Sequence, residues 1–327
     1  MAVIRSRLSD LFGLDAPVVL APMAGVSGGA LAAAVSRAGG LGLVGGGYGD
    51  PDVVAREMAL ADAPVGVGFI TWSLTPETLD RALDLRPRAL LLSFGDPVPF
   101  ADAIHAADVP LICQVQGVAH ARRAIAAGAA VLVAQGGEAG GHGAARGTMA
   151  LVPEIADLLA AEAPDVVLVA AGGIADGRGM AAALMLGADG VMLGSRFWAA
   201  SEALVAPGLV DAALAADGDC TVKGDLPDAA RGLNWPGAYA IRTLRTAFTD
   251  RWDGRGAALR DDADARAGWV RAMQSGDAEA ASPVVGEAVG LIGDRLPAAD
   301  ILARVVAEAE DLLRDAPRRS ETCSAPS

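Results

Sequence analysis

The sequence contains few cysteines and no cysteine pair with metal-binding or redox spacing. Cys113, Cys220 and Cys323 are its three cysteines, and none belongs to a C-x-x-C motif. This pattern predicts neither a disulfide framework nor a zinc site, and it favours a reducing compartment. Residues 1–10 contain two arginines and no apolar core, so a secretory signal is not expected. We therefore expect a cytoplasmic protein.

Positive charge is also scarce, and the longest uncharged stretch is interrupted. The chain has 26 Lys and Arg against 40 Asp and Glu, a net charge of -14, with no basic stripe. Nucleic-acid binding is not expected, because such binding depends on basic side chains that displace phosphate counterions. Residues 16–36 carry no charge, but Pro22, Gly25 and Gly29 interrupt them, so a membrane span is not predicted. The expected partner is a small molecule.

What the sequence does contain is a series of eight short apolar runs. They are residues 18–23, 41–45, 65–70, 89–94, 111–116, 131–135, 166–171 and 190–193. Each is free of charge and alternates weakly, which is typical of parallel strands buried on both faces. Ala-rich segments of helical length, such as residues 28–38, 118–127 and 149–163, lie between them.

This alternation of strand and helix predicts an α/β fold, either a closed barrel or a doubly wound open sheet. A dinucleotide-binding sheet would place G-x-G-x-x-G directly after the first strand, where residues 21–25 instead read A-P-M-A-G. Eight strands with late glycine pairs favour a (β/α)8 TIM barrel. We assign residues 1–200 to this barrel, because a chain of 327 residues can hold a barrel and an extra lobe.

The rest of the chain predicts an appended C-terminal helical lobe at residues 201–315. Residues 197–216, 241–252 and 298–314 have helical patterns, whereas residues 220–237 are irregular. The composition is compatible both with a lobe that covers the barrel mouth and with one that forms a homodimer interface. Residues 316–327 are poor in apolar side chains and are expected to be a disordered tail.

Two glycine motifs close the last two predicted strands. Gly172-Gly173 follows the seventh strand, with Asp176 placed to cap the next helix, and Gly194-Ser195 follows the eighth. In TIM barrels the loops after these strands commonly hold phosphate. Glycines allow close approach, and backbone N–H groups converge there. The glycines are also compatible with simple tight turns, but their occurrence after both strands favours a phosphate site.

His142 is the best candidate for a catalytic base. It lies in the glycine-rich loop at residues 136–143, after the sixth strand and therefore on the same barrel face. Imidazole titrates near neutral pH and can take a proton from a weakly acidic carbon, although a solvated loop histidine is the alternative. His105 and His120 fall in helical segments and are expected to be structural or exposed. Glu138 and His142 alone do not form a metal site, and we expect Glu138 to orient the loop.

Amide side chains near the barrel mouth suit a flavin. Pro22 and Met23 end the first strand, and Gln114 and Gln116 lie on the fifth. The pyrimidine edge of a flavin needs both hydrogen-bond donors and acceptors, which amides supply. Gln114 is equally suited to satisfying neighbouring backbone inside the barrel.

Four barrel motifs in this order give the chain a family resemblance. They are A-P-M-A-G at residues 21–25, G-E-A-G-G-H-G at 137–143, A-G-G-I at 171–174 and G-S-R-F at 194–197. Together with R-G-L-N-W-P at 231–236 and T-D-R-W at 249–252, they resemble the nitronate monooxygenase family, formerly the 2-nitropropane dioxygenases. The resemblance covers most of residues 15–255. It implies a barrel that binds FMN and oxidises alkyl nitronates with O2, giving a carbonyl compound and nitrite.

The resemblance also implies roles for individual residues. His142 matches the family's active-site histidine, which deprotonates neutral nitroalkanes or positions the nitronate. The implied cofactor-binding residues are Pro22, Met23 and Ala24 at the isoalloxazine, Gln114 at its pyrimidine side, Gly140 and Gly141 beside the flavin, and Gly172, Gly173, Gly194 and Ser195 at the phosphate. Phe69 and Trp72 are expected either to line the pocket or to pack in the barrel.

The chain departs from well-described family members at two positions. Gly68 stands where many have Asn, and Gln114 stands where some have Lys. A lost lysine removes a cation near the flavin pyrimidine, so cofactor contacts are expected to differ. Two alternatives stay open: an FMN-dependent NAD(P)H oxidoreductase of the enoyl-thioester or quinone reductase type, and a flavin-binding sensor without catalysis. A reaction of the inosine monophosphate dehydrogenase type is not expected, because the loop after the sixth strand lacks cysteine.

Overall fold

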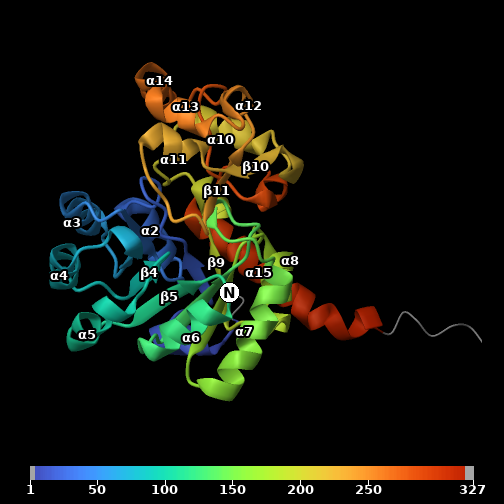
Figure 1. Ribbon diagram of the computed structural model, residues 1–327. Helices are drawn as coiled ribbons and strands as arrows, with labels where there is room; N and C mark the ends of the chain where they lie inside the picture. The colour runs from blue at the N-terminus through green and yellow to red at the C-terminus, as the bar shows by residue number, and fades with distance from the viewer. Residues whose placement is uncertain (1–3, 321–327) are drawn as a thin grey trace, which may run out of the picture.

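The computed structural model describes residues 4–320 and contains the predicted barrel (Figure 1). Its eight parallel strands are β1 (Val18–Leu20), β2 (Leu43–Gly47), β3 (Gly66–Ile70), β4 (Leu90–Ser93), β5 (Leu111–Val115), β6 (Val131–Gln135), β8 (Val167–Ala171) and β9 (Gly190–Leu193). They pair in the order β1-β9-β8-β6-β5-β4-β3-β2, and a parallel bridge between Val19 and Leu41 joins the two ends. Each strand overlaps the run predicted for it, and the TIM barrel is confirmed.

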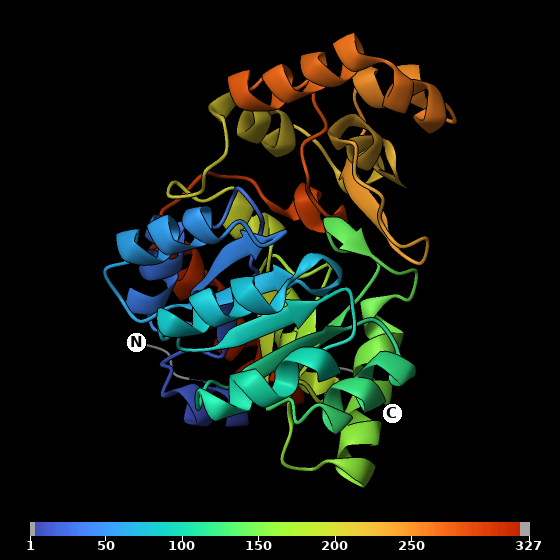
Figure 2. The same cartoon turned by 60° about the vertical axis from the view of Figure 1, so that its left-hand side comes forward.

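Helices cover the outside of the barrel (Figure 2). They are α2 (Gly29–Arg37), α3 (Pro51–Leu60), α4 (Pro76–Asp84), α5 (Val98–Ala106), α6 (Val118–Ala126), α7 (Thr148–Glu162) and α8 (Gly177–Met185). The short α1 (Arg7–Phe12) does not belong to this outer layer. Its Leu8 and Phe12 pack into the cluster inside the barrel, together with Val131 and Val167 at the starts of β6 and β8. No helix within residues 4–320 combines the length and apolar character that a bilayer span needs.

The long helix α15 (Ala298–Ser320) completes the ring of barrel helices by packing against α8 and α2. Residues 298–314, which their helical pattern predicts in the lobe, lie on the barrel instead. The physical reason is the apolar face of Ile301, Leu302 and Val305, which is buried in the outer core cluster. The helix also runs into the expected tail as far as Ser320, and residues 321–327 of that tail lie outside the described residues.

The barrel core has two layers, which explains the weak alternation of its strands. In β5, Leu111, Cys113 and Val115 belong to the cluster between strands and helices, whereas Ile112 belongs to the cluster inside the barrel. Every side chain of such a strand therefore needs an apolar or small residue, except where the strand ends at the barrel mouth. Polar residues at those ends, such as Gln114, are free to serve a ligand.

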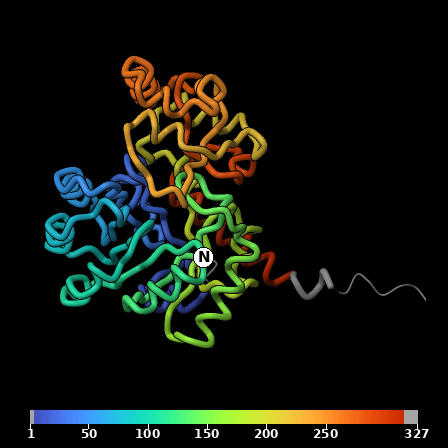
Figure 3. Tube along the Cα trace, in the orientation of Figure 1, coloured from blue at the N-terminus to red at the C-terminus, as the bar shows by residue number. Residues whose placement is uncertain are grey.

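The lobe lies over one end of the barrel (Figures 1 and 3). Its helices are α10 (Pro207–Leu214), α11 (Leu226–Arg231), α12 (Ala247–Trp252), α13 (Gly256–Asp261) and α14 (Ala263–Ser275), and its short helical turns are η2 (Gly218–Cys220) and η3 (Glu287–Leu291). Two further short turns, η1 (Thr71–Ser73) and α9 (Ser195–Trp198), follow the barrel strands β3 and β9. The predicted helix at residues 241–252 is wrong in its first half, because β11 (Ala240–Leu244) is a strand. It pairs with β10 (Thr221–Gly224) and with β7 (Gly141–Gly143) in the glycine-rich loop. Residue 142 is thereby fixed between barrel and lobe.

Candidate active site

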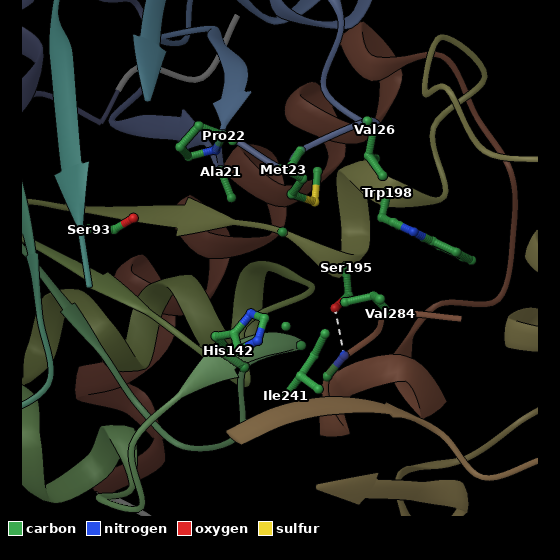
Figure 4. A pocket seen from close by; sticks show the side chains of 18 of the residues that line it. Ala21, Pro22, Met23, Val26, Ser93, His142, Ser195, Trp198, Ile241 and Val284 are labelled. Atoms are coloured by element: carbon green, nitrogen blue, oxygen red, sulfur yellow. Dashed lines mark hydrogen bonds between the residues drawn. The ribbon is translucent and has the colours of Figure 1, made fainter. Parts of the chain in front are cut away.

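A cavity of about 810 Å³ lies between the barrel mouth and the lobe (Figure 4). It brings together every site residue that the sequence predicted: Pro22, Met23, Ala24, Gln114, Gly140, Gly141, His142, Gly172, Gly173, Gly194 and Ser195. These residues come from the ends of β1, β5, β8 and β9 and from the loop after β6. The structure therefore supports a single site, while the role of each residue stays a prediction.

Gly172 and Gly173 form a wall that only glycine can build. Their φ angles are +99° and +74°, in the left-handed region that side chains rarely adopt. A Cβ on Gly172 would lie 2.8 Å from the carbonyl oxygen of Gly136. The predicted cap is confirmed, since the Asp176 carboxylate accepts the Gly179 N–H at 3.0 Å at the start of α8. The backbone here is thus held open toward the cavity.

Ser195 continues this wall after β9. Its Oγ accepts the N–H of Gly286 at 2.8 Å, which ties the wall to the segment before η3 (Figure 4). The hydroxyl retains a hydrogen that it can donate to a ligand. A Cβ on neighbouring Gly194 would meet nothing closer than Ala21 at 3.7 Å. The wall between the two glycine motifs therefore offers space and donors to an anionic group.

Gln114 presents an unsatisfied amide at the barrel mouth. Its Nε2 is buried and has no hydrogen-bond partner, so this nitrogen does not satisfy neighbouring backbone. A buried donor without a partner costs about 1–3 kcal/mol, which a ligand acceptor would recover. Gln116 differs, because its amide is already engaged: Nε2 donates to Gln135 Oε1 at 3.0 Å, and Gln135 Nε2 donates to the His142 carbonyl at 3.0 Å. These two glutamines fix the backbone of β7.

Gly68 explains the position of Pro22. A Cβ at residue 68 would lie 2.4 Å from Cγ of the Pro22 ring, so any side chain there would displace the proline. The Pro22 ring therefore sits in the space that a larger residue at position 68 would fill. This contact gives a structural reason for glycine where the resembling family often has Asn.

His142 is bonded to a carboxylate that nothing in the sequence around it predicts. Its Nε2 lies 2.9 Å and 3.1 Å from the two carboxylate oxygens of Asp228 on α11. Asp228 is 2% exposed and also accepts from Arg231 at 2.7 Å. A carboxylate accepts only, so the Nε2 position carries the hydrogen and Nδ1 of a neutral imidazole carries the lone pair. Asp228 therefore selects the tautomer that leaves Nδ1 basic.

Burial dominates the acidity of His142. Desolvation lowers its pKa below the ordinary histidine value, while the Asp228 hydrogen bond and charge oppose that shift; the charges of Arg231 and Lys223 lower it further. The imidazole is therefore neutral near neutral pH and can accept a proton. Its buried side chain makes the solvated-loop alternative wrong.

Aromatic rings cover His142 on the lobe side. The Trp235 ring stacks on the imidazole, with centroids 3.3 Å apart and planes 8° from parallel. Trp235 Nε1 donates to Tyr48 Oη at 3.0 Å, and Tyr239 packs edge-on against Phe94, which in turn packs edge-on against His142. Both tyrosines of the chain are in this group. Phe94 has φ of +58°, a strained conformation for a non-glycine residue that often marks functional sites.

The structure also locates the other residues that the sequence singled out, Phe69, Trp72 and Glu138. Phe69 lines the cavity. Trp72 does not line it and packs against two residues that do, Tyr48 and Trp235. Glu138 orients the loop as predicted, because its carboxylate accepts the Thr148 N–H at 2.9 Å. Within residues 4–320, no three potential metal ligands from His, Cys, Asp and Glu gather in one group.

The outer histidines are structural. His105 Nε2 lies 3.0 Å from the Ala127 carbonyl oxygen. His120 Nδ1 lies 3.2 Å from Gln116 Oε1, at the start of the glutamine chain that supports His142. The expectation that both are structural or exposed is confirmed.

Comparisons with known proteins show the family and the fold of the chain. A sequence profile described as nitronate monooxygenase matches residues 5–73 and 64–308. A nitronate monooxygenase of Neurospora crassa is 35% identical over 345 aligned positions, covering 91% of this chain and 90% of that protein. FabK from Thermotoga maritima superposes with a TM-score of 0.85 at 29% identity, covering 97% and 100% of the two chains. The nitroalkane oxidase of Streptomyces ansochromogenes superposes with a TM-score of 0.79 at 26% identity, covering 95% and 100%. The chain therefore belongs to the nitronate monooxygenase family and is a flavin-dependent oxidoreductase.

Proposed function

We propose that this protein oxidises alkyl nitronates with O2 to a carbonyl compound and nitrite, using FMN. The observation that carries the proposal is His142: a buried, neutral imidazole, bonded through Nε2 to Asp228, in the same cavity as the glycine wall. A base of this kind suits removal of a proton from carbon next to a nitro group. The apolar surroundings suit an alkyl substituent on that carbon.

The cavity fits FMN at both ends of the cofactor. Gly172, Gly173 and Ser195 would hold the phosphate through backbone N–H groups and the hydroxyl. The unpartnered Nε2 of Gln114 would donate to an acceptor on the pyrimidine edge of the ring, with Pro22 beside the isoalloxazine. Bound there, FMN supplies a redox centre that takes electrons from the nitronate and passes them to O2.

His142 would act through Nδ1. With a neutral nitroalkane, the α-proton moves to Nδ1 and the C–H electron pair is delocalised into the nitro group, which forms the nitronate. Asp228 stabilises the resulting imidazolium through the Nε2–H bond. With a preformed nitronate no proton transfer is needed, and the imidazole orients the anion.

The aromatic wall would control access to this base. Trp235 covers one face of the imidazole, so a substrate must approach the edge of the ring. Phe94 and Trp235 limit water beside His142, which strengthens its interaction with a developing nitronate charge. The arrangement thereby favours small or flat substituents near the reacting carbon.

The likeness to FabK supports a second candidate, oxidation of NAD(P)H by the same flavin. The deciding experiment mixes FMN-saturated protein anaerobically with propionate 3-nitronate, NADH or NADPH and follows flavin absorbance. Reduction by the nitronate, followed by reoxidation and nitrite release on adding O2, is the expected result. Reduction by NADH or NADPH alone would establish the second candidate in its place.

Two further outcomes bear on the proposal. Flavin binding without reduction by any of the three compounds would favour a sensor. Failure to bind FMN would remove the basis of the proposal itself. The cytoplasmic location and the homodimer stay predictions from the sequence.

A further inference from the structure

A second cavity, of about 500 Å³, lies beside the glycine-rich loop and contains an unusual pair of cations. It is lined by Gly137, Glu138, Gly143, Ala144, Ala145, Gly147, Lys223, Gly237, Ala238, Tyr239, Ala240, Arg242 and Glu287. Glu138 lines both cavities, and the other residues named here belong to the second alone. Four glycines in the wall leave its backbone accessible to a compact ligand.

Lys223 and Arg242 are direct cross-strand neighbours in this cavity. Lys223 on β10 pairs in register with Arg242 on β11. Like charges placed opposite each other in a sheet are unfavourable. Lys223 is also the only lysine in a chain of net charge -14. Two adjacent cations in so acidic a protein indicate a need for positive charge at this point.

Only one of the two cations forms a direct ion pair. Arg242 forms an ion pair with Glu287 at 2.7 Å. Lys223 Nζ instead donates to the Ala144 carbonyl at 2.5 Å, and among the described residues no carboxylate lies within ion-pair distance of it. Glu138 is occupied by its bonds to Thr148. Within the described part of the chain, Lys223 therefore has no carboxylate in direct contact, and the charges of Glu287 and Glu138 act on it only from farther away.

The cavity also contains unused hydrogen-bond donors. Arg242 Nη1 donates to Thr221 Oγ1 at 2.9 Å and Nη2 donates to the Gly137 carbonyl at 3.2 Å, but its buried Nε has no partner. Lys223 Nζ has three donors, of which one is engaged. An unpaired buried donor is costly, and an anion that accepts from both side chains would remove that cost.

We propose that this cavity binds a phosphate group, either free phosphate or the phosphate of a nucleotide. A phosphate offers several acceptor oxygens to Lys223 and Arg242. The four glycines that line this second cavity leave room for a compact tetrahedral group. The site is separate from the glycine wall at Gly172 and Ser195. It stands independently of the oxidation chemistry proposed above.

Occupancy of this site should reach His142 electrostatically. A Cβ on Gly143, the residue after His142, would lie 3.8 Å from Lys223 Nζ. The charge of Lys223 lowers the pKa of His142. A bound phosphate would offset that charge and raise the pKa, so the phosphate site would tune the base.

The test is calorimetric titration of the FMN-saturated protein at constant ionic strength with inorganic phosphate, pyrophosphate and adenosine 2′,5′-bisphosphate. Lys223→Gln should weaken binding about tenfold to a hundredfold, the loss expected for one charged hydrogen bond. Lys223→Arg keeps the charge and should retain most of the affinity. Arg245→Gln is the matched control, because Arg245 is an exposed cation just after β11, paired with Asp250 outside the cavity.

The outcomes separate the sources and can overturn the site. Tighter binding of the bisphosphate than of inorganic phosphate identifies a nucleotide, and equal binding identifies free phosphate. Equal affinity in wild type and Lys223→Gln overturns the proposal, as does the absence of binding for all three probes. Binding that occurs only when the probe releases FMN from the protein also overturns the proposal, because the probe would then occupy the flavin phosphate site.

Discussion

The barrel wall and the lobe wall of the main cavity are built in different ways. The barrel wall consists mostly of backbone, with Gly172, Gly173 and Gly194 at the ends of two strands. The lobe wall consists of side chains, of which Asp228 and Trp235 contact His142 directly. Added atoms should therefore damage the barrel wall, and removed atoms should damage the lobe wall.

His142 lies where the two walls meet. Its backbone belongs to the loop after β6 and pairs with Ile241 of the lobe sheet. The carbonyl is held from the barrel side by Gln135, and the imidazole is held from the lobe side by Asp228. The barrel thus places this residue, and the lobe sets its chemistry. Four substitutions can test this division of labour.

The largest effect is expected from His142→Ala. For neutral nitroalkanes, kcat/KM should fall about 100- to 10,000-fold, the usual contribution of a positioned base. For preformed nitronates the fall should be much smaller, because no C–H bond has to be deprotonated. Parallel kinetics with a nitroalkane and its nitronate, at matched FMN content, measure the difference.

The matched control for this variant is His105→Ala. His105 bonds only to the Ala127 carbonyl on the outside of the barrel, so its loss should leave both reactions unchanged. An equal loss for nitroalkane and nitronate in His142→Ala would contradict a role as base.

The second effect concerns the lobe wall alone, through Asp228→Asn. The variant loses the charge that stabilises the imidazolium, and turnover of neutral nitroalkanes should fall about 10- to 100-fold. Asp228 normally opposes the lowering of the His142 pKa. Its loss lowers that pKa further, so the rise of activity with pH should move to lower pH.

A pH profile of kcat/KM with a neutral nitroalkane measures this shift. Asp250→Asn, which removes an exposed carboxylate paired with Arg245, is the control and should leave the profile in place. A shift to higher pH in Asp228→Asn would contradict the assigned direction, and an unchanged profile would show that Asp228 acts only in folding.

The difference between the walls also explains what the sequence could predict. The glycine motifs and His142 are local signals, because each follows a strand whose apolar run is visible in the sequence. Asp228 is 86 residues from His142, and Tyr48 is 187 residues from Trp235. Nothing in the local sequence of either pair indicates its partner.

Two elements were misassigned for the same reason. Residues 240–244 are a strand because β7 and β10 provide partners on both sides, and tertiary pairing overrides local helical preference. Residues 298–320 belong to the barrel because α8 and α2 leave a surface for their apolar face. Both outcomes depend on distant segments, whereas the barrel strands depend on their own composition.

The third effect is expected in the barrel wall, from Gly68→Asn. The new Cβ would lie 2.4 Å from Pro22, so the proline and the strand end must shift. Overpacking of this kind typically lowers the free energy of unfolding by about 1–3 kcal/mol. Urea unfolding measures the loss, and FMN titration should show weaker binding because Pro22 moves.

The control for this added side chain is Gly117→Ala. A Cβ there meets no atom within 4 Å, and its backbone is extended, so stability and FMN binding should be retained. Unchanged stability in Gly68→Asn would mean that the β1 loop can move without cost and that Pro22 is not a fixed wall.

The smallest effect is expected from Tyr48→Phe, which removes a barrel hydroxyl that holds Trp235 of the lobe wall. Trp235 Nε1 then loses its acceptor, and the variant should lose about 0.5–1.5 kcal/mol of stability. Tyr239→Phe is a close control, because Tyr239 belongs to the same ring cluster and no hydrogen bond of its hydroxyl is found among the described residues. Thermal unfolding of both variants, with the KM for a nitronate, measures the difference. If both lose the same stability, the rings are held by packing alone; a loss confined to Tyr48→Phe would show that a single hydrogen bond orients Trp235 over His142.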